Sequence, residues 1–228
     1  ISSSHSAPKS VSVSGLTFSN SNVGNNINDD CSGVKVAANN GTLTMKHVAF
    51  RNNPKDGLDI SSNSGNVLLV NALFADNGVT GLNVSDNPDN TTLVNTTFAN
   101  NGTDMTNGLT NVYNSTSWSN GTQNMPATEM LNNKVFAANT VNNDIEQGPN
   151  FYDPDNADKD LRDYRIRPSL TLLNSGSNGL YLEHALGSAA AMSETERDLY
   201  NVSRVVGGTI DIGAYEYRAP LQQIVYVK

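Results

Sequence analysis

A pattern of apolar and polar positions recurs along the chain at a fixed spacing of 24 residues. Each copy carries a phenylalanine followed by polar residues, and the copies are Val48–Asn53, Ala72–Asn77 and Thr96–Asn101. A spacing of this length is typical of stacked supersecondary units. We therefore predict an elongated stack of repeats, which offers a long ladder-like surface rather than one deep pocket.

Each repeat also contains a shorter piece with strand character. It begins with glycine in Gly33–Val36, Gly57–Ile60 and Gly81–Val84, again 24 residues apart. Gly108-Leu109 follows 27 residues later, and we interpret it as the next copy after a three-residue insertion. Every repeat is thus expected to pair one short strand with one longer apolar piece.

The longer piece changes its pattern in the middle. In Thr42–Phe50, apolar and polar residues alternate as far as Met45, break at Lys46-His47 and alternate again to Phe50. Such a break in a period of two is typical of a corner between two strands. Three short strands and three corners per repeat predict an all-β fold, a right-handed parallel β-helix of the pectin-lyase-like class with a C-terminal capping region.

Stacked coils lie about 4.8 Å apart, so equivalent residues of successive repeats form columns. The expected columns are an internal phenylalanine stack and an asparagine ladder at a corner: Phe50, Phe74 and Phe98, and Asn53, Asn77 and Asn101. In the coil after them, Trp118 is expected to take the phenylalanine place.

The repeat pattern stops near Glu146, which divides the chain into three parts. Residues 1–145 are predicted to form the coils, and residues 146–217 a cap that shields the core and the open strand edge of the last coil. Within the cap, Leu180–Leu199 is the stretch with helix-like content, and an excursion made of a loop and a helix is expected there. Residues 218–228 are interpreted as a linker and the possible start of a following module.

Composition and charge narrow the function classes. Only 16% of the 228 residues are charged, which disfavours amphipathic helices. The net charge of −8 argues against nucleic acid or an anionic membrane as partner. No stretch of 18 apolar residues occurs, so this segment is not expected to insert in a membrane. Cys31 is the one cysteine, which excludes an internal disulfide.

Several segments carry a resemblance to a known family. The repeated Phe-x-x-Asn phrase resembles the repeats of bacterial surface β-helix proteins, including polymorphic outer-membrane proteins. The later segments resemble, in order, the closing region of Bacteroidetes-type right-handed β-helix proteins with a choice-of-anchor domain. These segments are Gly148–Phe151, Asp163–Ile166, Leu173–Asn178 and Ile210–Tyr217.

The resemblance implies export and display at the cell surface or outer membrane of a bacterium. The final Ile224–Lys228 is similar to the opening of a further β-helix unit, so adjacent modules of the same chain are expected partners. The resemblance implies no single activity, because such folds carry lyases, hydrolases, adhesins and inert stalks.

One set of residues could support catalysis on polysaccharides. Lys35, Asp59 and Asn83, with Thr110, are expected to share an outward column one coil apart. A lyase would use Lys35 as base and Asp59 to hold Ca²⁺, whereas a hydrolase needs paired carboxylates such as Asp56 and Asp59. The alternative interpretation of Lys35 and Asp59 is a surface ion pair, worth about 0–1 kcal/mol.

Two further features can be interpreted either as functional sites or as parts of the structure. Asp86 and Asp89 lie in the segment Ser85–Asn90, where they form a weak candidate Ca²⁺ site or a solvated turn. His47 is the histidine inside a regular repeat, and it shares its place with Asn71 and Asn95. We therefore expect it to bond to the next coil rather than to act as a general base.

Binding without catalysis requires only common polar residues and aromatic rings. Asparagine, serine and threonine can bond to sugar hydroxyls, and spaced aromatic rings can stack on pyranoses. Tyr113 is the preferred exposed candidate for ligand binding, whereas Trp118 is expected to be buried; Tyr152 and Tyr164 are further aromatics in the cap. The preferred function is adhesion to a polysaccharide, host glycan or protein with no cofactor. A lyase or hydrolase is the alternative, and a passive spacer the second.

Overall fold

The computed structural model describes residues 10–19, 31–37, 41–61, 65–85, 91–106, 110–122, 125, 127–137, 140–144, 146–187 and 196–219. The chain is mostly β. The strands are β1 Val11–Ser14, β2 Thr17–Ser19, β3 Val34–Ala37, β4 Leu43–Arg51, β5 Leu58–Ser61, β6 Val67–Ala75, β7 Thr80–Ser85, β8 Thr91–Val94, β9 Thr97–Ala99, β10 Thr103–Thr106, β11 Thr110–Tyr113, β12 Thr116–Trp118, β13 Ala127–Leu131, β14 Lys134–Val135, β15 Phe151–Asp153 and β16 Asp163–Ile166. The helices are the 3₁₀ turn η1 Lys159–Leu161 and the α-helix α1 Asn178–Ala185.

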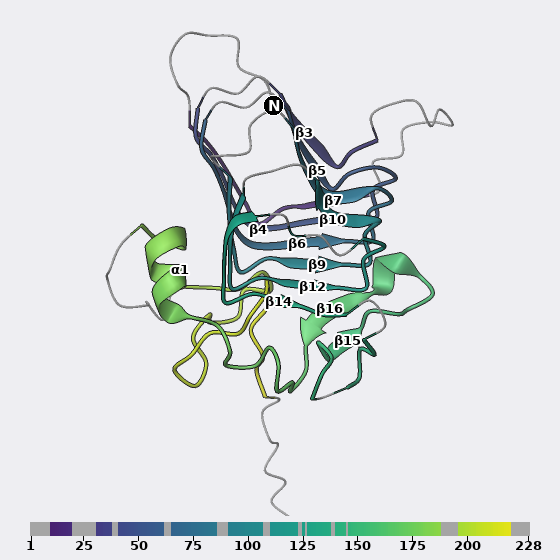
Figure 1. Cartoon of the computed structure of the whole chain (residues 1–228), viewed down its shortest axis with the longest axis vertical. Coiled ribbons are helices and arrows are strands. Elements are labelled where there is room, and N and C mark those ends of the chain that lie inside the picture. The colour runs from purple at the N-terminus through teal and green to yellow at the C-terminus, as the bar shows by residue number, and fades with distance from the viewer. Residues whose placement is uncertain are drawn as a thin grey trace, which may run out of the picture.

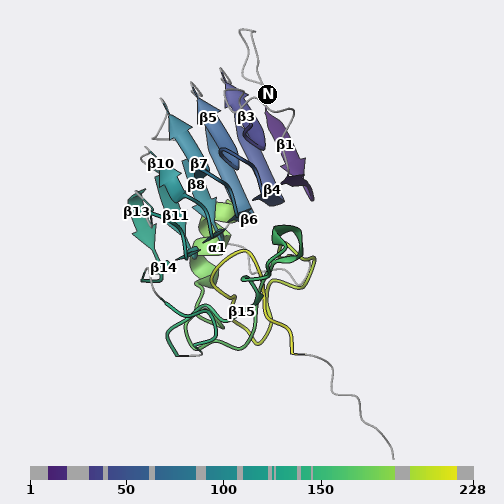
Figure 2. The ribbon, with the colours of Figure 1, turned by 90° about the vertical axis from the view of Figure 1, so that its right-hand side faces the viewer.

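Parallel pairing dominates the strands. A ten-stranded sheet contains β1, β2, β4, β6, β8, β9, β11, β12, β13 and β14, and a four-stranded sheet has the order β10-β7-β5-β3. The long sheet curls into a half-barrel (Figures 1 and 2). Phe50 pairs with Phe74 and Leu58 with Leu82, so the 24-residue spacing of the sequence is the register of the sheets.

The corners predicted from the sequence are confirmed at two columns of left-handed backbone. One column bends β4, β6 and their equivalents, and it consists of His47, Asn71, Asn95, Asn114 and Asn132, with φ between 49° and 56°. The second follows the same strands and consists of Asn52, Asp76, Asn100 and Ser119. Asparagine and aspartate tolerate this backbone region better than other residues with side chains. The corners, which need residues that tolerate positive φ, therefore explain many of the asparagines in the chain.

The two predicted columns of like side chains are confirmed. Phe50, Phe74 and Phe98 stack with ring centroids 5.0 Å apart, and Phe18 extends the stack at 5.2 Å. In the asparagine ladder, each Nδ2 donates to the Oδ1 of the next coil at 2.8–3.0 Å, and the members are Asn53, Asn77, Asn101 and Asn120. Stacked rings and buried amide bonds thus hold successive units in one register.

The predicted place of Trp118 is wrong by one residue. Phe98 pairs with Ser117, and Trp118 pairs with Ala99 on the opposite face of the strand. The unit from Asn101 to Asn120 has 19 residues instead of 24, which changes the phase of the pattern. Trp118 therefore lies outside the phenylalanine column, where it packs edge-on against Phe151 at 5.8 Å.

The proposed copy at Gly108-Leu109 is also wrong. Met105 pairs with Leu82, so β10 continues the four-stranded sheet three residues before Gly108. Gly108 and Leu109 themselves lie outside the described residues. Asp104 takes the place below Gly81, and its Oδ2 accepts a bond from Ser117 Oγ at 2.7 Å.

The C-terminal segment, described over residues 146–187 and 196–217, lies alongside successive units rather than only below the last one (Figures 1 and 2). It includes the antiparallel pair β15–β16 and helix α1. The helix expected within Leu180–Leu199 is present as Asn178–Ala185, and residues 188–195 are outside the described part. Ser177 caps it by accepting a bond from the Leu180 amide.

The first corner column attaches this segment to the coils. Asn71 Nδ2 donates to the carbonyl of Arg197 at 2.8 Å, and Asn95 Nδ2 to that of Asp211 at 2.9 Å. Asn114 and Asn132 make equivalent bonds to Ser177 and Ser175. One row of amides therefore shapes the corners and also binds the backbone of the C-terminal segment.

Candidate functional site

The outward column of the four-stranded sheet is a chain of polar contacts. Lys35 Nζ lies 3.3 Å from Asp59 Oδ2, and Asn83 Nδ2 donates to Asp59 Oδ1 at 3.3 Å. Thr106 Oγ1 donates to Asn83 Oδ1 at 2.5 Å. The predicted neighbours Lys35, Asp59 and Asn83 are thus brought together, while Thr106 rather than Thr110 continues the column.

Strand alternation produces this column. Leu58 and Ile60 are fully buried in the core, so Asp59 between them faces outward. The parallel register places Lys35 and Asn83 on either side of Asp59. Half of the Lys35 side chain is exposed (51%), so its ion pair is screened by solvent and contributes about 0–1 kcal/mol.

A second carboxylate stands next to this column. Asp56 lies at the corner before β5 and is largely buried. Burial raises its pKa, a bond from Thr80 opposes that shift, and the charge of Asp59 adds to it. The charges of Asp56 and Asp59 therefore interact, as expected for one carboxylate at a corner and another on the strand that follows it.

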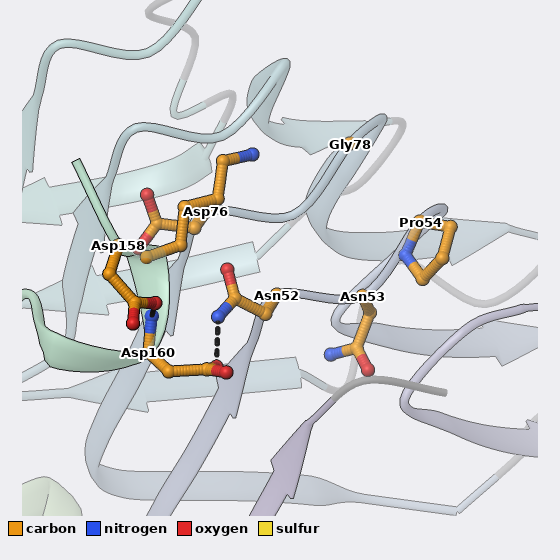
Figure 3. Close-up of a pocket in the computed structure, with 8 residues that line it drawn as sticks. Asn52, Asn53, Pro54, Asp76, Gly78, Asp158 and Asp160 are labelled. Atoms are coloured by element: carbon orange, nitrogen blue, oxygen red, sulfur yellow. Dashed lines mark hydrogen bonds between the residues drawn. The ribbon is translucent and has the colours of Figure 1, made fainter. Parts of the chain in front are cut away.

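The corner that follows β4 and β6 contains a pocket of about 350 Å³ (Figure 3). Asn52, Asn53, Pro54, Asp76 and Gly78 line it from the corners, and Asp158, Lys159 and Asp160 from the C-terminal segment. Asn52 Nδ2 donates to Asp160 Oδ1 at 2.6 Å across it. The pocket thus lies at the contact between the coils and η1, which we call the seam.

Asp76 anchors this seam. Its buried carboxylate accepts a bond from Tyr164 Oη at 2.8 Å and pairs with Arg162. Burial raises the pKa of Asp76, while the bonds from Tyr164 and Arg162 oppose that shift. Asn100 Nδ2 also donates to Tyr164 Oη at 2.8 Å. These contacts use the carboxylate to fasten β16, which favours a structural role.

The exposure predicted for Tyr113 is wrong. Only 2% of Tyr113 is exposed, because the ring stacks on His184 of α1 with centroids 3.8 Å apart. The C-terminal segment supplies this cover, which sequence alternation within β11 does not reveal. In this structure the ring of Tyr113 is therefore closed to a sugar.

The remaining predicted groups have structural contacts or lie outside the described part. His47 Nε2 is 2.8 Å from the Arg197 carbonyl and 3.3 Å from Asn71 Nδ2, in line with the expected bond to the next coil. Asp86 and Asp89 are outside the described residues. Within the described part of the chain, no three His, Cys, Asp or Glu residues are grouped to hold a metal ion. Nor does any described helix have the length and apolar character to span a membrane.

Sequence reasoning missed two clusters. The contact of Asp76 with Arg162 and Tyr164 joins residues 86 and 88 positions apart, and its one signal was a carboxylate in a column of asparagines. Tyr200 and Arg165 meet on the surface of the C-terminal segment, with the guanidinium 4.6 Å from the ring centroid. Comparison with protein-family models, curated proteins and solved structures finds no match for this chain.

Proposed function

We propose that this chain is a right-handed parallel β-helix module, displayed on a bacterial surface, that binds glycans without catalysis. Three observations support the β-helix: parallel sheets, a repeating register and columns of like residues. Export and surface display rest on the resemblance of the repeats and the closing segments. The binding surface is the outward column Lys35, Asp59, Asn83 and Thr106.

The observation that carries the binding proposal is the contrast between sheet faces. The outward faces of β6, β9 and β12 are apolar and buried under the C-terminal segment through Ala75, Ala99 and Trp118. The four-stranded sheet lies away from that segment (Figure 1) and bears polar side chains instead. The half-exposed Lys35 and the partly exposed Asn83 and Thr106 provide donors and acceptors for sugar hydroxyls, with the buried Asp59 bonded between Lys35 and Asn83.

Glycan-array binding followed by calorimetry tests this function. Asn83→Ala removes the central amide, and we expect it to weaken binding at least tenfold, about 1.4 kcal/mol. Thr42→Ala is the matched control, because Thr42 is exposed and lies immediately before β4 of the other sheet. Equal affinity of Asn83→Ala and the native chain would assign the glycan to another surface.

The neighbouring carboxylates Asp56 and Asp59 favour a glycoside hydrolase as second candidate. A raised pKa at one carboxylate of a pair is a feature of general acids. Release of new reducing ends, abolished by Asp56→Asn, would support it. Unsaturated product lost in Lys35→Ala would instead indicate a lyase. With neither binding nor turnover, a passive spacer remains.

A further inference from the structure

Two tyrosines and two arginines alternate in a stack on the surface of the C-terminal segment. The guanidinium of Arg165 lies 4.6 Å from the ring centroid of Tyr200 and 5.3 Å from that of Tyr152. Arg167 lies 5.1 Å from the Tyr152 centroid. The rings are exposed, Tyr200 by 61% and Tyr152 by 39%. Large exposed aromatic rings next to cations are a feature of binding sites.

A cleft of about 160 Å³ opens beside this stack. Tyr152, Arg165, Tyr200, Val202, Tyr217 and Arg218 are among the residues that line it. Drug-sized ligands occupy about 300–1,000 Å³, so this cleft admits a ligand group no larger than one ring. A single residue of a longer chain that runs across the surface meets that limit.

One cation of the cleft, Arg165, is held in place. Arg165 Nε donates to both carboxylate oxygens of Asp163 at 2.9 Å, and the pKa of Arg165 is raised, first of all by this bonding. No hydrogen bond joins Arg165 Nη1 to any other described residue. A guanidinium that is already oriented loses little entropy when it binds an anion.

The acids that line the cleft are buried and bonded to the backbone. They are Asp198 and Glu216, and both accept bonds from backbone amides. Burial raises the pKa of Glu216 to about 8, which favours its neutral form. Arg165 and Arg218 are the cationic side chains that line the cleft, in a chain whose net charge is −8.

We propose that this cleft binds one uronate residue of an acidic glycan. The exposed ring of Tyr200 stacks on the pyranose, and Arg165 Nη1 and Arg218 pair with the carboxylate. The site is separate from the Lys35–Asp59–Asn83 column and stands without the function proposed for it. Because Arg165 and Arg218 attract the carboxylate by charge, binding here is expected to weaken with salt.

Calorimetry with tetragalacturonate, and with the neutral galactose tetramer of the same linkage, tests the site. The native chain is expected to bind the acidic tetramer alone, and tenfold more weakly at 0.5 M than at 0.05 M salt. Tyr200→Ala and Arg218→Gln should each reduce affinity at least tenfold. Leu170→Ala is the matched control, because Leu170 is also exposed on the C-terminal segment but lies outside the cleft.

The outcomes separate this site from the sheet face. Asn83→Ala should leave tetragalacturonate affinity unchanged, and a loss there would move the acidic ligand to the sheet. No binding by the native chain, equal binding of the neutral tetramer, or full affinity in Tyr200→Ala would overturn the proposal. Thermal unfolding of each variant checks folding. Tyr200→Phe keeps the ring and should retain affinity, and it is the variant to measure if Tyr200→Ala is unstable.

Discussion

At the scale of single residues, the asparagines of the first corner column combine two roles. Asn71 has a φ of 53° and is fully buried. Its Nδ2 donates to the Arg197 carbonyl and to Tyr181 Oη. The backbone role needs a residue that tolerates left-handed geometry, and the bonding role needs a short amide. Asparagine satisfies both, which explains its recurrence at this position.

Two substitutions at Asn71 separate these roles. Asn71→Gly keeps the left-handed backbone but loses the amide bonds, and we expect it to destabilise the fold by about 1–3 kcal/mol. Asn71→Ala adds about 1–2 kcal/mol of backbone strain. Urea unfolding measures both free energies. If the two variants were equally stable, the φ of Asn71 would carry no cost and this explanation of the column would fail.

The phenylalanine stack gives a prediction at the same scale. Phe74 is fully buried between Phe50 and Phe98. Phe74→Ala should cost about 3–5 kcal/mol in the free energy of unfolding, from lost burial and the cavity left behind. Phe18 ends the described stack and is only partly buried. Phe18→Ala should therefore cost less in the same urea titration, and an equal cost would contradict the stacked order.

At the scale of elements, the C-terminal segment contains a buried ionic cluster. Arg204 is fully buried, and its Nη2 donates to the carbonyls of Asp211 and Gly213. Glu216 lies nearby, with Oε2 3.9 Å from Arg204 Nη1. Burial raises the pKa of Glu216 to about 8, and the charge of Arg204 offsets this shift only partly.

This pKa makes stability depend on pH. The ordinary pKa of glutamate is 4.5, so between pH 4.5 and about 8 the folded state keeps a proton that the unfolded state has released. The free energy of unfolding should therefore fall as pH rises across this range. Glu216→Gln cannot ionise, so urea titrations at pH 5, 7 and 9 should give a smaller fall than in the native chain. An identical slope in both proteins would show that Glu216 does not carry the effect.

The contacts between elements differ in how well the sequence predicts them. The phenylalanine column and the contacts of Lys35, Asp59 and Asn83 were predictable, because one period sets all of them. Trp118 was misplaced because a shorter unit shifts the phase, which no strict period can show. Contacts such as Asp76 with Tyr164 join distant segments, and local patterns do not encode them.

At the scale of the whole molecule, the coils and the C-terminal segment share a hydrophobic cluster that lies outside the interior of the coils. The outward faces of β4, β6, β9 and β12 carry Ala49, Leu73, Ala75, Ala99 and Trp118, and these residues pack with Phe151, Tyr164, Ile166, Leu172 and Ile212. Outward apolar residues on the coils were the available sequence signal for this cover. A cap on the last coil alone would leave those of β4 and β6 exposed.

This packing predicts that residues 1–145 do not fold alone as the intact chain does. Without the C-terminal segment, the apolar face around Leu73 and Ala99 meets water, and the buried amides of Asn71 and Asn95 lose their carbonyl partners. Each lost bond of that kind costs about 1–3 kcal/mol, a large share of a stability of 5–15 kcal/mol. We expect a fragment ending at residue 145 to aggregate or to unfold at much lower urea than the full chain, as followed by circular dichroism. A fragment with the midpoint of the full chain would mean that the coils are stable through their own stacking, and that the segment merely covers them.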